Sequence, residues 1–187
     1  LALLEDFFDQ VIGLKSIHRK GWAKKVGIKE PESVADHTYS MALMSVVLAE
    51  LQALDVQKVA TMSLIHDLAE SLVGDYTPDE ISLKQKRKLE NNAMKEILSS
   101  LPLTLAKKYE KIWNEYQETK TKEAQLVHDI DRLEMAFQAR KYFEEGYDKD
   151  KLGKFLKTAD KEIKNEYLRK ILNKIIRNTI NLTNTNV

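Results

Sequence analysis

Residues 59–75 read VATMSLIHDLAESLVGD. The first half places apolar side chains on nearly every side, as in a buried helix, and Gly74 is a typical helix end. On a helix His66, Asp67 and Glu70 are spaced so that their polar groups share one stripe. Because burying polar groups is costly unless they are paired, this helix needs a partner for that stripe.

The local sequence offers no positive charge to pair with these groups. Between residues 59 and 83 there is no lysine or arginine, and two consecutive predicted helices contain Lys58 as their single basic residue. A divalent cation is the simplest source of the missing charge. The other interpretation is a core histidine satisfied by its neighbouring aspartate, with Glu70 at the solvent edge.

Composition limits the class of protein. The chain has 187 residues, enough for one domain with its own core. Its 30 basic and 29 acidic residues give a formal charge of +1, which provides no global electrostatic case for nucleic acid. With no cysteine, no membrane-length apolar run and no signal-peptide pattern at the start, we expect a cytoplasmic protein away from membranes. The few glycines and prolines predict an all-α fold.

Two segments before the opening stretch matter for the site. Residues 3–17 have the pattern of an amphipathic helix, and the basic segment 18–27 is expected to be a loop, either a solvated linker or an anion-binding loop over the site. Pro31-Glu32-Ser33 then begins a helix. Its expected inner stripe, which includes a histidine, is His37, Met41, Met44, Leu48 and Leu51.

Further helices follow the opening stretch. Thr77-Pro78-Asp79-Glu80 has the capping-box pattern and predicts a helix start. Helices are then expected over 84–99, with Leu89 among its inward residues, over 103–119, and over 123–136. In the last of these, Asp131 shares a stripe with apolar neighbours. Glu134, three residues further on, is either a group that supports the site from behind or, in the simpler interpretation, a surface residue. Residues 148–180 predict one or two closing helices, and the final Asn- and Thr-rich residues are expected to fray.

The chain thus has three predicted helices that each direct possible metal ligands inward. They carry His37 on the first, His66 and Asp67 on the second, and Asp131 on the third. Two imidazoles and two carboxylates suit one divalent ion, and these ligands do not select among Mn²⁺, Co²⁺, Fe²⁺, Ni²⁺, Zn²⁺ and Mg²⁺.

The order of these residues resembles the H…HD…D signature of the HD-domain metal-dependent phosphohydrolases, and more closely their 5′-deoxynucleotidase branch, which includes the HD domain-containing protein 2 type. The similar motifs are ESVADH at 32–37, HDLAE at 66–70, GD at 74–75 and DRLEM at 131–135. The resemblance covers about residues 19–142. It implies a helical HD-domain bundle spanning 1–187, with closing helices over 148–180.

The resemblance also implies roles at the centre of the site. His37, His66, Asp67 and Asp131 would hold the ion. Glu70 would be the acid/base that acts on the attacking water, and we count Glu70 and Asp67 as the catalytic pair.

For the substrate, the resemblance implies that Arg19 neutralises the phosphate, Asp75 lies beside the sugar hydroxyl and Trp22 shapes the sugar pocket. In bacterial members the arginine and tryptophan are adjacent, whereas here Lys20 and Gly21 separate them, which affects Trp22 more than Arg19.

The leading hypothesis is a metal-dependent phosphomonoesterase that hydrolyses (deoxy)ribonucleoside 5′-monophosphates to nucleoside and phosphate. Two alternatives remain open. One is an HD phosphohydrolase acting on a triphosphate, a cyclic nucleotide or an alarmone, and the other is a non-catalytic metal- or nucleotide-binding helical domain. The partner is then a small nucleotide, and a homodimer through helix 84–100 or the C-terminal helices is also open.

Overall fold

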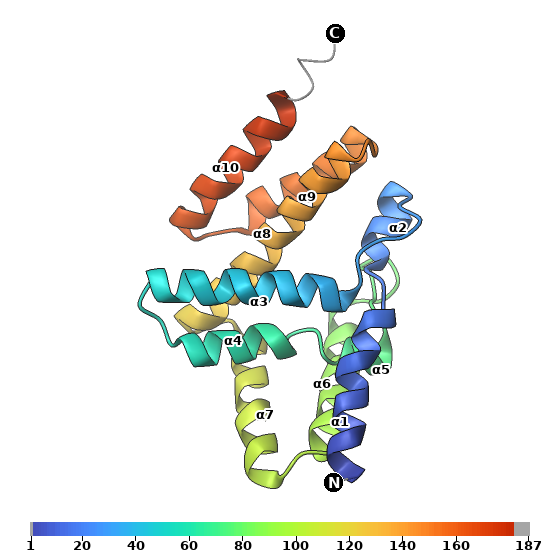
Figure 1. Cartoon of the computed structure of the whole chain (residues 1–187), viewed down its shortest axis with the longest axis vertical. Coiled ribbons are helices and arrows are strands. Elements are labelled where there is room, and N and C mark those ends of the chain that lie inside the picture. The colour runs from blue at the N-terminus through green and yellow to red at the C-terminus, as the bar shows by residue number, and fades with distance from the viewer. Residues whose placement is uncertain (1, 182–187) are drawn as a thin grey trace.

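The computed structural model describes residues 2–181, and within this range it is built of helices with no strand (Figure 1). The all-α expectation is therefore confirmed. The elements, in chain order, are α1 (Ala2–Gly13), η1 (Leu14–Ser16), α2 (Lys20–Val26), α3 (Val34–Leu51), α4 (Val56–Ile65), α5 (Glu70–Val73), α6 (Leu83–Ser99), α7 (Leu103–Glu118), α8 (Lys122–Glu144), α9 (Lys149–Glu162) and α10 (Glu166–Asn181). No helix among the described residues is long and apolar enough to cross a membrane. The expected fraying of the Asn- and Thr-rich end concerns residues outside the described range.

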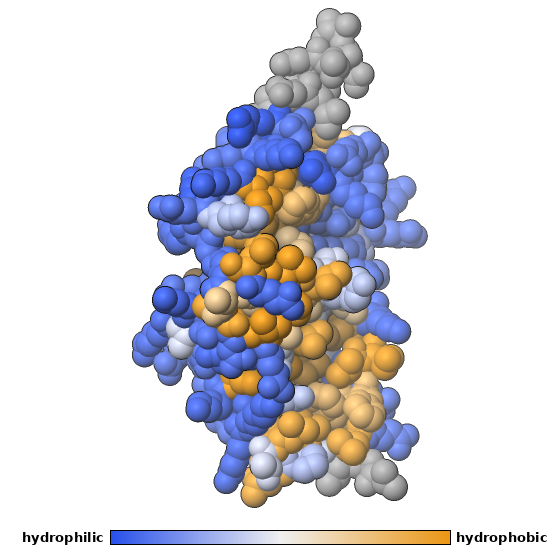
Figure 2. All heavy atoms as spheres, turned by 60° about the vertical axis from the view of Figure 1, so that its left-hand side comes forward, coloured by the Kyte–Doolittle hydropathy of each residue, from blue (hydrophilic) through white to orange (hydrophobic). Residues whose placement is uncertain are grey.

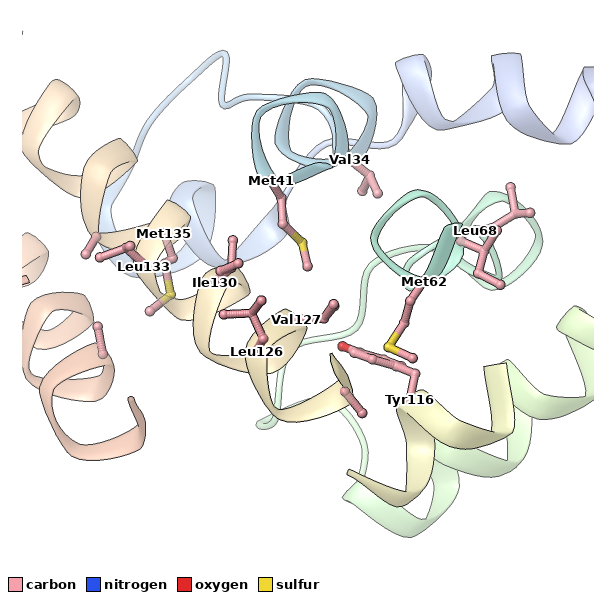
Figure 3. Packing of buried hydrophobic residues seen from close by; sticks show 14 of the residues in the cluster. Val34, Met41, Met62, Leu68, Tyr116, Leu126, Val127, Ile130, Leu133 and Met135 are labelled. Carbon is pink, nitrogen blue, oxygen red and sulfur yellow. The ribbon is translucent and has the colours of Figure 1, made fainter. Parts of the chain in front are cut away.

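Helix α8 is the central element of the fold. It contacts α3, α4, α7, α9 and α10, so most of its surface is covered by other helices. Figure 3 shows Met41 of α3 and Met62 of α4 packed toward Val127 and Ile130 of α8. Burying each such side chain stabilises the fold by roughly 1.5–3 kcal/mol. The predicted inward stripe of this helix is confirmed, because Asp131 is 8% exposed among buried apolar neighbours.

Helix α3 begins where the sequence predicts. Ser33 is its N-cap, and a capping box joins the Ser33 and Asp36 side chains to each other's backbone N–H groups. His37, Met41 and Leu48 are buried as expected, but the expectation for Leu51 is wrong, since it is 66% exposed. Leu51 follows Leu43 and Val47 at four-residue spacing, and all three side chains are exposed.

The basic segment is not a loop, because residues 20–26 form α2. The backbone N–H of Lys20, at the first position of this helix, donates to Asp75 Oδ2 at 2.6 Å. Gly27 ends the helix in the left-handed region with φ 91°, which glycine adopts at little cost. The helix thus depends on Asp75, which lies 55 positions away in the chain, and local pattern could not indicate this.

A short antiparallel bridge holds the start of α2 against the start of α3. The bridge pairs His18 with Ser33. On one side Arg19 N–H donates to Glu32 O at 3.0 Å, and on the other Val34 N–H donates to Ile17 O at 2.7 Å. The backbone of Arg19 is therefore fixed relative to the helix that carries His37.

The predicted helix over 59–73 is interrupted. Helix α4 ends at Ile65, and the chain makes a turn through 66–69 before α5. In this turn successive backbone bonds span three residues instead of four, as in Leu68 N–H to Ile65 O and Glu70 N–H to Asp67 O. The tighter winding changes the directions of the polar side chains. The prediction that His66, Asp67 and Glu70 share one stripe of a continuous helix is therefore wrong. Gly74 does end α5, with φ 78°.

The next helix start was also misplaced. Thr77 donates its backbone N–H and its hydroxyl to Glu80 Oε2, at 2.8 and 3.0 Å, which is half of a capping box. Glu80 N–H donates to Thr77 O instead of to the side chain, and the residues close a turn. Helix α6 begins after Ser82, which forms a second capping box with Gln85. Its inner side includes Ala93, Met94 and Ile97 as predicted. Leu89 was expected there and is 40% exposed.

Candidate metal-dependent active site

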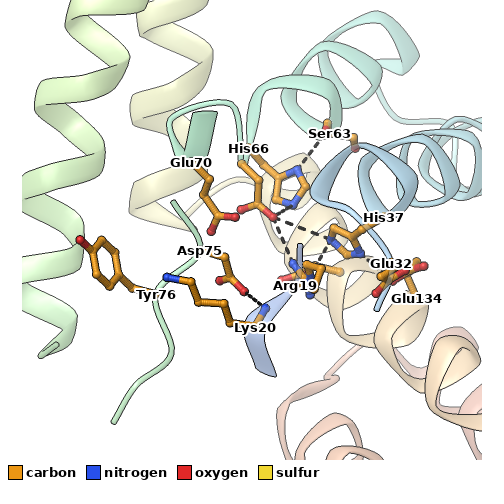
Figure 4. A network of polar contacts seen from close by, with 12 residues as sticks. Arg19, Lys20, Glu32, His37, Ser63, His66, Glu70, Asp75, Tyr76 and Glu134 are labelled. Carbon is orange, nitrogen blue, oxygen red and sulfur yellow. Dashed lines mark hydrogen bonds and ion pairs between the residues drawn. The ribbon is translucent and has the colours of Figure 1, made fainter. Parts of the chain in front are cut away.

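Four side chains from three parts of the chain converge in one place (Figure 4). His37 comes from α3, His66 and Asp67 from the turn after α4, and Asp131 from α8. His66 Nε2 lies 3.0 Å from Asp67 Oδ2, and His37 Nε2 lies 3.3 Å from Asp131 Oδ1 and 3.9 Å from Asp67 Oδ2. Ligand atoms of His37, His66 and Asp67 all lie within 4.8 Å of one another.

The possible ligand atoms at this point fit a divalent cation. His37 Nε2, His66 Nε2 and Asp131 Oδ1 are buried and have no hydrogen-bond partner among the residues that the structure describes. Buried polar atoms in native proteins are nearly always paired, so three such atoms facing one point indicate a missing charged partner. Imidazole nitrogens and carboxylate oxygens are the ligands that first-row divalent metals prefer.

Both histidines are held by their other ring nitrogen. His66 Nδ1 lies 2.7 Å from Ser63 O, an acceptor that requires Nδ1 to carry the hydrogen and leaves Nε2 with its lone pair. His37 Nδ1 lies 2.6 Å from Glu134 Oε2. Glu134 is 4% exposed, so the surface interpretation of this residue is wrong. Its carboxylate orients His37, as carboxylates behind metal-binding histidines commonly do.

A second acidic residue lies behind His37. Ligand atoms of Glu32, His37 and Glu134 come within 4.8 Å of one another. Burial and the charge of Glu134 raise the pKa of Glu32 to about 7. The side of His37 that faces away from the converging donors therefore carries an accumulation of negative charge.

Arg19 lies beside the convergence point. Its Nη1 donates to Asp67 Oδ2 at 3.2 Å, and both side chains are 16% exposed. Burial raises the pKa of Asp67, but the nearby His66 and Arg19 lower it more, so it lies below its usual range. Asp67 thus stays ionised, which suits a metal ligand, and Arg19 is positioned to meet an anion that approaches the same point.

Glu70, the first residue of α5, is 1% exposed. One carboxylate oxygen, Oε1, lies 3.2 Å from Lys86 Nζ of α6. The other, Oε2, is buried and has no partner within residues 2–181. Burial and the charge of Asp67 raise the pKa of Glu70 well above its usual value. A carboxyl group whose pKa is raised in this way takes up a proton more readily than a free one, as a general acid/base must.

Asp75 and Trp22 both contact other residues of the protein in ways that stabilise the fold. Asp75 binds the backbone of Lys20, as described above. Trp22 is 2% exposed, donates its indole N–H to Glu32 Oε1 at 2.8 Å and stacks on Phe155 at 4.1 Å between ring centroids. Their substrate contacts stay predictions.

His66, Asp67 and Asp131 line a cleft of about 830 Å³ together with Glu70 and Asp75. Its lining also includes Arg19 and Trp22, Phe155 of α9, residues 76–78 and part of α6. A volume of this size accommodates a small ligand such as a nucleotide. Sequence analysis did not identify Lys86, which lines the cleft from α6, because nothing in the sequence distinguishes it from the lysines at 84 and 88.

The helical fold and a buried pair of histidines with two aspartates define a metal-dependent hydrolase of the HD type. A sequence model of the HD domain matches residues 11–172. The chain is 42% identical over 145 residues to 5′-deoxynucleotidase HDDC2 of Dictyostelium discoideum, covering 73% of this chain and 76% of that protein. It is 38% identical over 137 residues to 5′-deoxynucleotidase HDDC2 of Homo sapiens, covering 72% and 66%.

A solved structure agrees with these sequence matches. A conserved hypothetical protein from Pyrococcus furiosus superposes with a TM-score of 0.77 at 33% identity, covering 92% of this chain and 98% of the other. The chain belongs to the HD-domain family, and the resemblance seen in its motifs is confirmed.

Proposed function

We propose that this protein is a metal-dependent phosphomonoesterase that hydrolyses (deoxy)ribonucleoside 5′-monophosphates to nucleoside and phosphate. The observation that supports it most is the set of buried, unpartnered donor atoms of His37, His66 and Asp131 beside Glu70 and Arg19. The curated relatives named 5′-deoxynucleotidase support the same reaction class.

The residues divide the work of phosphate-ester hydrolysis. His37, His66, Asp67 and Asp131 would hold a divalent ion, which when bound would supply Lewis acidity toward water and the phosphoryl oxygens. Arg19 balances the negative charge that spreads over the phosphate in the transition state.

Glu70 acts as the general acid/base of the reaction. Its unpartnered Oε2 orients the attacking water and accepts a proton from it, and the carboxyl group then delivers that proton to the departing 5′ oxygen. Burial raises the pKa of Glu70, which favours holding that proton until the 5′ oxygen departs.

The decisive experiment measures phosphate release after chelation and add-back of Mn²⁺, Co²⁺, Ni²⁺, Zn²⁺, Fe²⁺ or Mg²⁺. The substrates are dAMP, dTMP and their ribose counterparts, with a nucleoside triphosphate and a cyclic nucleotide for comparison. We expect monophosphate hydrolysis that depends on the added ion. Turnover confined to triphosphates or cyclic nucleotides would favour the other phosphohydrolase class, and binding without turnover would favour a non-catalytic domain.

Two variants test the assigned roles. Glu70→Ala is expected to retain the ion and lose about 10²–10⁴-fold in kcat, the usual contribution of a general acid/base. Asp67→Ala is expected to lose the ion. Glu50→Ala, an exposed acid on α3, serves as the matched control. Full metal content in Asp67→Ala, or normal turnover in Glu70→Ala, would contradict the assignment.

The finer roles at the sugar are part of the proposal. Asp75 is assigned to the sugar hydroxyl and Trp22 to the wall of the sugar pocket, and both line the cleft. Asp75→Asn retains an oxygen acceptor for Lys20 N–H and removes the charge. We expect this variant to change the ratio of kcat/KM between deoxyribose and ribose substrates. Equal ratios in wild type and variant would remove Asp75 from sugar recognition.

A homodimer is also proposed, and α3 offers a surface for it in addition to α6 and the C-terminal helices. Tyr39, Leu43, Val47 and Leu51 follow one another at four-residue spacing and are each at least half exposed. Figure 2 shows a broad hydrophobic area at mid-height, where α3 and α4 lie. Such areas on soluble proteins commonly mark contacts with other proteins. Light scattering should give a dimer for wild type and a monomer for Leu43→Glu. A monomeric wild type would refute the proposed homodimer.

Cytoplasmic location stays a prediction from composition.

A further inference from the structure

Lys86 enters the acidic side of the cleft from α6. It lies in the second turn of the helix, where its backbone N–H donates to Ser82 O at 2.9 Å, so the capping box at Ser82 fixes its direction. Its side chain is 28% exposed, whereas its neighbours Lys84 and Lys88 are exposed. One lysine of three in this turn is therefore directed inward.

The ammonium group of Lys86 is fully engaged. Its Nζ lies 3.2 Å from Glu70 Oε1, 3.4 Å from Tyr76 O and 3.4 Å from Glu90 Oε1. An ammonium group has three N–H donors, and here three acceptors are in reach. Burial lowers the pKa of Lys86, but Glu70 and Asp67 raise it above its ordinary value, so the group is charged. A substrate phosphate would have to displace one of these acceptors.

Lys86 contacts only one of the two carboxylate oxygens of Glu70. Lys86 binds Oε1, while Oε2 is buried without a partner in the described chain. Figure 4 shows the Glu70 carboxylate on the same side as His66 and the converging donors. Fixing one oxygen of a carboxylate fixes the direction of the other. The bond to Tyr76 O also ties Lys86 to the segment that follows Asp75.

We infer that Lys86 is a positioning residue, which holds the Glu70 carboxylate so that its free oxygen faces the attacking water. It acts through Glu70 and does not bind the phosphate. This inference rests on the proposed function, in which Glu70 is the acid/base.

The test compares Lys86→Met, which retains the aliphatic length, with Lys86→Arg, which retains the charge, and with Lys88→Met as an exposed control on the same helix. Hydrolysis of dAMP is measured at saturating Mn²⁺, together with metal content. For Lys86→Met we expect kcat to fall about 10–100-fold, part of the value of a general acid/base, with KM and metal content nearly unchanged. Lys86→Arg should recover much of kcat, and Lys88→Met should match wild type.

A double variant separates positioning from phosphate binding. If Lys86 acts through Glu70, Glu70→Ala with Lys86→Met should be no slower than Glu70→Ala alone, because residues that act as a unit are not additive. A raised KM with unchanged kcat in Lys86→Met, or a double variant much slower than Glu70→Ala, would overturn the inference. So would normal kinetics in Lys86→Met.

A failure of the proposed function can be distinguished from a failure of the inference about Lys86. If wild type hydrolyses no nucleoside monophosphate, the reaction is wrong, and crystal structures of wild type and Lys86→Met decide the positioning role without any assay. A displaced or disordered Glu70 carboxylate in the variant would support the inference. An unmoved Glu70 would overturn it.

Discussion

Replacing Glu134 with alanine removes the carboxylate that lies 2.6 Å from His37 Nδ1. His37 is fully buried, so its Nδ1 gains no contact with water in exchange. The imidazole can then rotate or take the other tautomer, which removes the Nε2 lone pair from the point where the donors converge. Loss of a carboxylate behind a metal-binding histidine typically lowers metal affinity about 10–100-fold, or roughly 1.4–2.8 kcal/mol.

The measurement is competition for Mn²⁺ or Co²⁺ against a chromophoric chelator near neutral pH. Glu134→Gln retains an oxygen acceptor for His37 and loses the charge, so it should lie between wild type and Glu134→Ala. Glu144→Ala removes an exposed carboxylate from the same helix and should leave the affinity unchanged. An affinity for Glu134→Ala equal to that of the Glu144 control would refute the orienting role.

Three further predictions concern charge and capping. Arg19→Gln should lower kcat/KM for nucleoside monophosphates about 10²–10³-fold through lost stabilisation of phosphate charge, and an unchanged value in steady-state kinetics would exclude it. Because the pKa of Glu32 is raised from 4.5 to about 7, its stabilising contribution is present below pH 4.5 and lost as pH rises through 7. In metal-free protein, the unfolding free energy of wild type relative to Glu32→Gln should therefore fall across that window, by about 1.4 kcal/mol for each pKa unit; a flat difference in urea titrations would count against it. Ser33→Ala should cost about 1 kcal/mol in the same titrations through loss of the α3 cap, and no change would show that the cap is dispensable.

The apolar periodicity of the sequence predicted the helices and the inward direction of His37 and Asp131. Both residues lie on helix faces whose other members are apolar. Because those apolar residues are buried in the core, the polar residue on the same face is buried as well. The sequence Pro31-Glu32-Ser33 also predicted the start of α3, where Ser33 and Asp36 form a local capping box. Features determined by residues close in the chain were thus accessible from the sequence.

Other features depend on contacts between distant residues. Helix α2 carries a glycine and has no local N-cap, and its first N–H is satisfied by Asp75. The choice of Lys86 over the adjacent lysines follows from how α6 packs against α5, and no periodicity records that choice. The bond between Glu134 and His37 spans 97 positions, so the sequence could suggest the residue but not its partner.

The bridge between His18 and Ser33 has a practical consequence for engineering. It anchors Arg19 from both sides, while Lys29 and Glu30, in the connection between α2 and α3, are exposed. Exposed connections whose ends are held by the fold tolerate added chain. A reporter domain inserted between these two residues should therefore leave Arg19 and the start of α3 in place.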